Sequence, residues 1–187
     1  MKITVYCGAS VGNNLAHQQA TIKLGKWIAE HQHTLVYGGG NAGLMGLLAN
    51  TVLENGGEVI GIMPTFLQER ELAHKGLTQM ITVNSMPERK SKMIELGDAY
   101  IALAGGPGTL EEIAEVISWA RIGQNPNPCI LFNSDGYYDD LKAFFDNMVK
   151  QGFLTQADRD KTLFSDNLVE IESFIQSYTP PKVRVYY

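Results

Sequence analysis

Short apolar runs rich in β-branched residues alternate with longer segments of helical periodicity along most of the chain. The short runs predict strands, and segments with apolar residues at i, i+3 and i+4 predict helices. Strands joined by such helices lie parallel, because the crossover returns the chain to the same end of the sheet. The expected strands cover residues 3–7, 35–37, 59–63, 80–83, 100–103 and 129–132, and the expected helices cover 15–29, 44–53, 87–96, 109–121 and 137–150.

This alternation predicts an α/β fold with a single doubly wound, mainly parallel sheet and helices on both faces, which is a Rossmann-like arrangement. The length of 187 residues and the hydrophobic content of 44% suit one nucleotide-binding domain over residues 1–187. Residues 64–79 have weak periodicity and are expected to form an irregular segment of the kind that often borders a site. Residues 179–187 contain Pro180 and Pro181, so we expect a C-terminal tail or an added edge strand there.

Three predicted strands end in glycine-rich turns, at residues 8–10, 38–43 and 105–109. Ligands of open α/β sheets bind beyond the carboxyl ends of the strands. Glycine allows close backbone approach there, and the free N–H groups of the following helix attract an anion. One such turn is routine in this fold, but several in one sheet favour a phosphate site. The expected substrate-binding residues in these turns are Ser10, Gly39, Gly40, Asn41, Gly105, Gly106, Gly108 and Thr109.

Composition excludes several classes of protein. The net charge is −5 and no basic run is present, so we expect no nucleic-acid partner. The first ten residues are too short an apolar stretch for a signal peptide or a membrane span, which indicates a cytoplasmic protein without a membrane partner. Cys7 and Cys129 match no CxxC pattern, so neither a zinc site nor a disulfide is expected.

Other nucleotide and hydrolase motifs fit less well. Residues 38–43 match G-x-G-x-x-G, but they follow the second strand, and Glu58 lies at the wrong end of the next strand to bind a ribose. These two features disfavour NAD. No Walker lysine follows either glycine cluster, and no G-x-S-x-G accompanies the four histidines.

The helix expected from residue 87 carries cations where core residues are expected. Met86, Arg89, Lys90 and Met93 share one face of this helix. Ser85 and Glu88 have capping-box spacing, which places the start of the helix beside the carboxyl end of a strand. Two interpretations remain open for Arg89: it points into the ligand cleft, or it belongs to a solvated charge cluster and extends its guanidinium to the surface.

The helix after the third glycine turn opens with Thr109 and has Glu112 three residues later. Side chains of a first helical turn lean toward the N-terminus, which would aim the Glu112 carboxylate at the phosphate turn. The same spacing is that of a capping box, which explains both residues without any ligand. An acid beside an anion site would repel the anion. Its presence there indicates another role, such as stabilising a positive charge that develops during a reaction.

With these residues, the chain resembles the LOG family of cytokinin riboside 5′-monophosphate phosphoribohydrolases, formerly labelled lysine decarboxylases, over about residues 2–153. The family motif P-G-G-x-G-T-x-x-E is matched at residues 104–112, with Ala104 in place of proline. The motif M-H-x-R-K is matched at residues 86–90, with Pro87 in place of histidine. The alignment also places Glu71 on a substrate-binding acid of the family and Ser118 on a threonine.

The resemblance implies hydrolysis of the N-glycosidic bond of a purine-type nucleoside 5′-monophosphate, such as AMP or a cytokinin-like nucleotide, to free base and ribose 5-phosphate. It implies catalysis by Glu112 and Arg89, substrate contacts from Glu71, Met86, Lys90 and Ser118, and no metal or other cofactor. A homodimer is expected, because the family is dimeric and helix 110–122 is apolar on two sides, with Ile113 on one and Val116 on the other. The alternative is a nucleotide or cofactor carrier that performs no chemistry.

Overall fold

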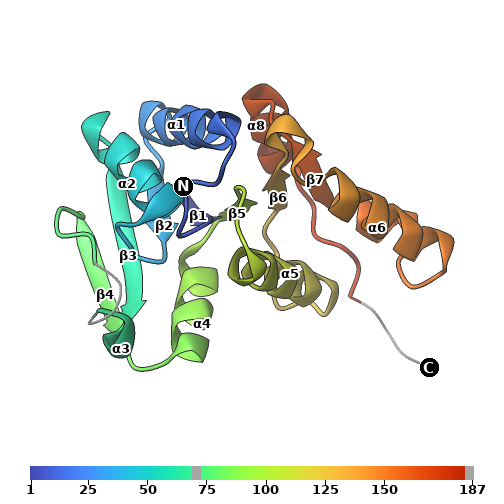
Figure 1. The fold of residues 1–187 in the computed structure, drawn as a ribbon. Coiled ribbons are helices and arrows are strands. Elements are labelled where there is room, and N and C mark those ends of the chain that lie inside the picture. The colour runs from blue at the N-terminus through green and yellow to red at the C-terminus, as the bar shows by residue number, and fades with distance from the viewer. Residues whose placement is uncertain (69–72, 184–187) are drawn as a thin grey trace.

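The computed structural model describes residues 1–68 and 73–183, which form one layered α/β unit (Figure 1). The strands are β1 (Lys2–Tyr6), β2 (Thr34–Tyr37), β3 (Glu58–Pro64), β4 (Gln79–Val83), β5 (Ala99–Ala102), β6 (Cys129–Phe132) and β7 (Thr162–Ser165). The helices are α1 (Leu15–Glu30), α2 (Gly43–Glu54), α3 (Thr65–Gln68), α4 (Met86–Leu96), α5 (Pro107–Arg121), α6 (Asp139–Lys150), α7 (Gln156–Arg159) and α8 (Leu168–Ser177), with a 3-10 turn η1 (Ser134–Gly136) before α6.

The seven strands form one sheet in the order β4-β3-β2-β1-β5-β6-β7, and every neighbouring pair is parallel. The chain builds the sheet outward from β1 in one direction and then from β5 in the other. The turns that follow β1 and β5 therefore leave the sheet toward opposite faces, which opens a crevice between them. The predicted doubly wound parallel sheet is confirmed.

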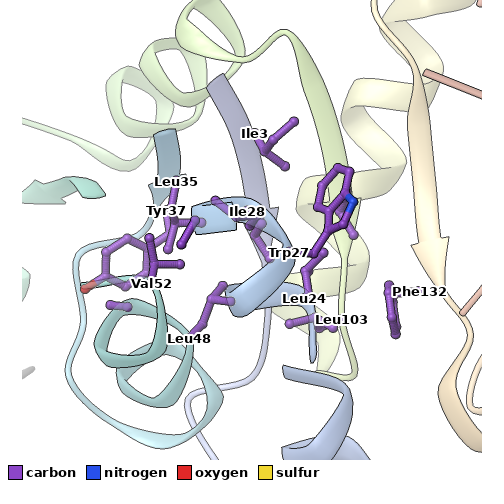
Figure 2. Packing of buried hydrophobic residues seen from close by; sticks show 14 of the residues in the cluster. Ile3, Leu24, Trp27, Ile28, Leu35, Tyr37, Leu48, Val52, Leu103 and Phe132 are labelled. Carbon is purple, nitrogen blue, oxygen red and sulfur yellow. The ribbon is translucent and has the colours of Figure 1, made fainter. Parts of the chain in front are cut away.

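Each face of the sheet carries its own hydrophobic core. On one face, Leu24 and Ile28 of α1 and Leu48 of α2 pack on strand residues such as Leu35, and Figure 2 shows this cluster from close by. On the other face, Met93 of α4 and Ile113 and Val116 of α5 pack against a second buried cluster. Burial on both faces explains why the central strands read as continuous apolar runs.

The predicted helices and strands are all present, with boundaries that differ by at most two residues. The helix predicted to begin at Tyr137 begins at Asp139, because η1 precedes it. The final quarter adds α7, β7 and α8, which the periodicity did not reveal. Residues 179–183 form no regular structure, so the described part of the tail adds no edge strand. None of the described helices is long and apolar enough to cross a membrane.

Candidate active site

The turns after β1 and β5 contact each other directly at the crevice. The Gly8 N–H donates to the Ala104 carbonyl at 3.0 Å. A Cβ on Gly105 would lie 2.1 Å from Thr109 Oγ1 and 3.0 Å from the Gly8 nitrogen. Only glycine fits at position 105, and its absent side chain lets the two turns close over the buried Thr109.

A cavity of about 580 Å³ lies beside these two turns. The turn after β1 contributes most of the cavity wall. The rest comes from α1, α2, the turn after β5 and Tyr137, which follows η1. The lining residues are Gly8, Ala9, Ser10, Val11, Gly12, Asn13, Asn14, His17, Leu44, Ala104, Gly105, Gly106 and Tyr137.

Three helices begin at the edge of this cavity. Asn14 caps α1, Leu44 is the second residue of α2, and Gly106 is the N-cap of α5, and all three line the cavity. Helix N-termini carry free N–H groups and partial positive charge. No aspartate or glutamate is among the lining residues. The cavity is therefore suited to an anionic group such as a phosphate.

The glycine turn after β2 packs against the turn after β1 that forms the cavity wall. Gly43 has φ +59°, and a Cβ there would lie 2.3 Å from the Ala9 carbonyl carbon. Gly39 and Gly40 are buried, and their carbonyls accept hydrogen bonds from the His74 N–H and the Tyr37 hydroxyl, both at 3.0 Å. Neither glycine lines the cavity, and neither does the exposed Asn41. Substrate binding by these three residues stays a prediction.

Arg89 lies inside the protein, with only 8% of its surface exposed. Its Nη2 donates to the Gly38 carbonyl at 3.3 Å, and its Nη1 donates to Met86 Sδ at 3.7 Å. Its Nε is buried and has no hydrogen-bond partner among the described residues. The solvated interpretation of Arg89 is wrong. A buried guanidinium with an unused donor is prepared to meet a ligand or an anionic neighbour.

Glu112 serves no capping role in α5. Helix α5 begins at Pro107 with Gly106 as the N-cap, so Thr109 already lies inside the helix. The capping-box interpretation of Thr109 and Glu112 is therefore wrong. Burial raises the pKa of Glu112 to about 7, and the positive charge of Arg89 opposes part of this rise. A carboxyl group with a pKa near neutrality suits proton transfer at physiological pH.

Lys90 and Ser118 are not among the residues that line the cavity. Lys90 pairs with Glu111 and Glu115 of α5, at 3.2 Å in the second case, and these contacts raise the pKa of Lys90. Ser118 is exposed on α5, about 13 Å along the helix axis from Thr109. Glu71 lies outside the described residues. For these residues a role in substrate binding stays a prediction.

Sequence reasoning missed two aromatic side chains of the cavity wall. His17 comes from the first turn of α1, and Tyr137 follows η1. Their rings meet edge to face at 5.1 Å, and the Tyr137 hydroxyl donates to the Gly105 carbonyl. For Tyr137, the one signal in the sequence was its position a few residues after the carboxyl end of strand β6. His17 could have been found from its position three residues after the helix cap.

Comparisons with known proteins agree with this geometry. A family model described as "Possible lysine decarboxylase" matches residues 45–173. A cytokinin riboside 5′-monophosphate phosphoribohydrolase of Rhodococcoides fascians is 43% identical over 162 residues, which are 86% of this chain and 82% of that protein. The similarly named LOG2 of Arabidopsis thaliana is 39% identical over 179 residues, 96% of this chain and 84% of that protein.

The chain belongs to the LOG family. The family model is named for a lysine decarboxylase, whereas the two relatives are named for a phosphoribohydrolase. The residues of the cavity bear on this difference. A pyridoxal-dependent decarboxylase needs a lysine in its pocket to form a Schiff base. No lysine is among the residues that line the cavity of this LOG chain.

Solved structures confirm the LOG fold over nearly the whole chain. A molybdenum cofactor carrier protein from Chlamydomonas reinhardtii superposes with a TM-score of 0.70 and covers 94% of this chain and 95% of its own. The two sequences are 19% identical, so the likeness concerns the fold alone.

Proposed function

We propose that this chain hydrolyses the N-glycosidic bond of a purine-type nucleoside 5′-monophosphate, with Glu112 and Arg89 as its catalytic residues. The observation that carries the proposal is the pKa of Glu112, which burial raises to about 7 while the positive charge of the buried Arg89 opposes part of the rise. Both belong to helices whose N-termini lie at the carboxyl ends of the strands. Glu112 stands on the same helix whose first residues border the anion-binding cavity.

Cleavage of this bond develops positive charge on the ribose. The Glu112 carboxylate stabilises that charge and takes a proton from the attacking water. A guanidinium does not act as an acid at physiological pH, so Arg89 positions the reactants and stabilises negative charge. The helix N-termini hold the 5′-phosphate and fix the sugar for attack.

The names of the relatives support this reaction and favour adenine or an N6-modified adenine as the base. The rival function is a carrier that binds a nucleotide or cofactor without reaction. A carrier gains nothing from a buried glutamate with a raised pKa, because an ionisable acid near the ligand phosphate weakens binding.

Incubation with a panel of nucleoside 5′-monophosphates, including AMP and N6-prenylated AMP, tests the proposal. We expect release of free base from at least one monophosphate and a far lower rate with the matching nucleosides, which lack the phosphate. Tight binding of a monophosphate without release of base would favour the carrier.

We also propose that two copies of the chain associate through α5, in the cytoplasm. Ile113 and Val116, which suggested two apolar sides, both face the sheet and are fully buried. The exposed side instead carries a ridge with i, i+4 spacing, formed by Leu110, Ala114, Ser118 and Ile122. Ridges of this kind, with small residues at the centre, allow a second helix to approach closely. The free thiols of both cysteines suit a reducing compartment.

A further inference from the structure

His17 is the one imidazole among the described residues that line the cavity. It projects from the first turn of α1, next to the Asn14 cap. Its ring meets the edge of Tyr137, and its Cδ2 would lie 3.5 Å from a Cβ on Gly12. The imidazole thus packs against Tyr137 at the cavity wall.

The two ring nitrogens of His17 are in different surroundings. Nδ1 is buried and has no hydrogen-bond partner among the described residues. Nε2 has no partner among the described residues either, but it is not one of the fully buried unpartnered atoms, and His17 lines the cavity. Of the two neutral tautomers, the one with its proton on Nε2 avoids an orphaned N–H group inside the protein. This tautomer presents a hydrogen-bond donor to the cavity.

Backbone N–H donors at helix N-termini also border the cavity. The first turns of α1, α2 and α5 border it, and no carboxylate competes for the Nε2 proton from the lining residues. Tyr137 links His17 to the phosphate turn, because it contacts the imidazole with its ring and the Gly105 carbonyl with its hydroxyl. A phosphate at the N-terminus of α5 would therefore lie on the side of the cavity that His17 faces.

We propose that His17 is a specificity-determining residue whose Nε2–H donates to an oxygen of the substrate's 5′-phosphate. The proposal rests on the function proposed above and concerns how that same site selects phosphorylated over unphosphorylated nucleosides. A hydrogen bond to a charged oxygen is stronger than one to a neutral group, so its loss falls on binding of the phosphate.

The test is titration calorimetry of His17→Phe with ribose 5-phosphate, which carries the phosphate and needs no chemistry. Phenylalanine keeps the ring contact with Tyr137 and removes both nitrogens. We expect affinity to fall about ten-fold, equivalent to about 1.4 kcal/mol. Thermal stability should be unchanged or higher, because the buried unpartnered Nδ1 is gone. His31→Phe, at the other end of α1, is the matched control and should bind as wild type does. Unchanged affinity in His17→Phe would overturn the proposal.

Two further measurements keep the proposal testable if His17→Phe folds poorly. His17→Gln retains a donor and should recover part of the affinity. The ¹⁵N shifts of the wild-type imidazole report which nitrogen carries the proton, and a proton on Nδ1 in the bound state contradicts the proposal. A parallel assay of base release from AMP separates the two claims: His17-dependent binding without release refutes only the reaction, and release with His17-independent binding refutes only the role of His17.

Discussion

Burial raises the pKa of Glu112 to about 7, and the positive charge of Arg89 opposes part of this rise. Glu112→Gln removes the ionisable group but keeps the size of the side chain. We expect base release to slow by about 10²- to 10⁴-fold, the usual contribution of a general acid or base. The neighbouring Glu111→Gln should keep most activity, because Glu111 points to Lys90. Equal activity in both variants would remove Glu112 from the mechanism.

The raised pKa of Glu112 also affects stability. Between about pH 4.5 and pH 7 the folded state binds more protons at this site than the unfolded state does, so this contribution to stability falls as pH rises. The Glu112→Gln variant has no ionisable group at this position, so its stability does not change in this way with pH. We therefore expect the variant to exceed wild type by on the order of 1–3 kcal/mol at pH 8 and to match it near pH 4. Urea unfolding at the two pH values measures this, and a pH-independent difference would contradict it.

Among the elements, the turn after β2 meets α4 where Gly38 contacts Arg89. A Cβ on Gly38 would lie 1.9 Å from Arg89 Nη2, so this glycine leaves room for the guanidinium. In Gly38→Ala the guanidinium must leave its position, and we expect at least a ten-fold loss of kcat with circular dichroism unchanged. Gly76→Ala is the control, because its Cβ meets only ordinary contacts, the nearest at 3.4 Å. Full activity in Gly38→Ala would show that the position of Arg89 is not critical.

Most elements were predictable because each strand of a parallel sheet is buried on both faces and each helix on one. The missed strand β7 lies at the sheet edge, where Leu163 and Phe164 are only partly buried, so its pattern is weaker. The start of α5 was also misplaced, because Gly106 caps it without a side chain. A glycine cap leaves no polar residue as a signal, and Thr109 resembled the missing cap.

The residues of the candidate site were predictable where they lie close together in the sequence. The β5 turn and Glu112 are close in sequence, and they are close in the structure. Arg89 remained ambiguous because its burial depends on Gly38, which is 51 residues away. His17 and Tyr137 lie 120 residues apart and meet only because α1 and η1 pack beside the same crevice. Such contacts depend on strand order, which periodicity does not specify.

At the scale of the whole molecule, the exposed ridge on α5 predicts a dimer. We expect light scattering to give twice the mass of the chain at micromolar concentration. Ser118→Arg places a long cation at the centre of the ridge and should shift the protein to the monomer. Ser173→Arg, at an exposed position on α8, is the control and should remain dimeric. A monomeric wild type, or a dimeric Ser118→Arg, would contradict the proposed interface.

The cavity bordered by three helix starts, with no carboxylate among its described lining residues, has a consequence for the order of events after bond cleavage. Under the proposed function, the two products differ in charge: the sugar half keeps its dianion, and the departing base is neutral. The base then diffuses away first, while the sugar phosphate stays bound and blocks the next turnover. Turnover in the cell would follow the local concentration of that sugar phosphate, so reactions that consume it would set the pace of this protein.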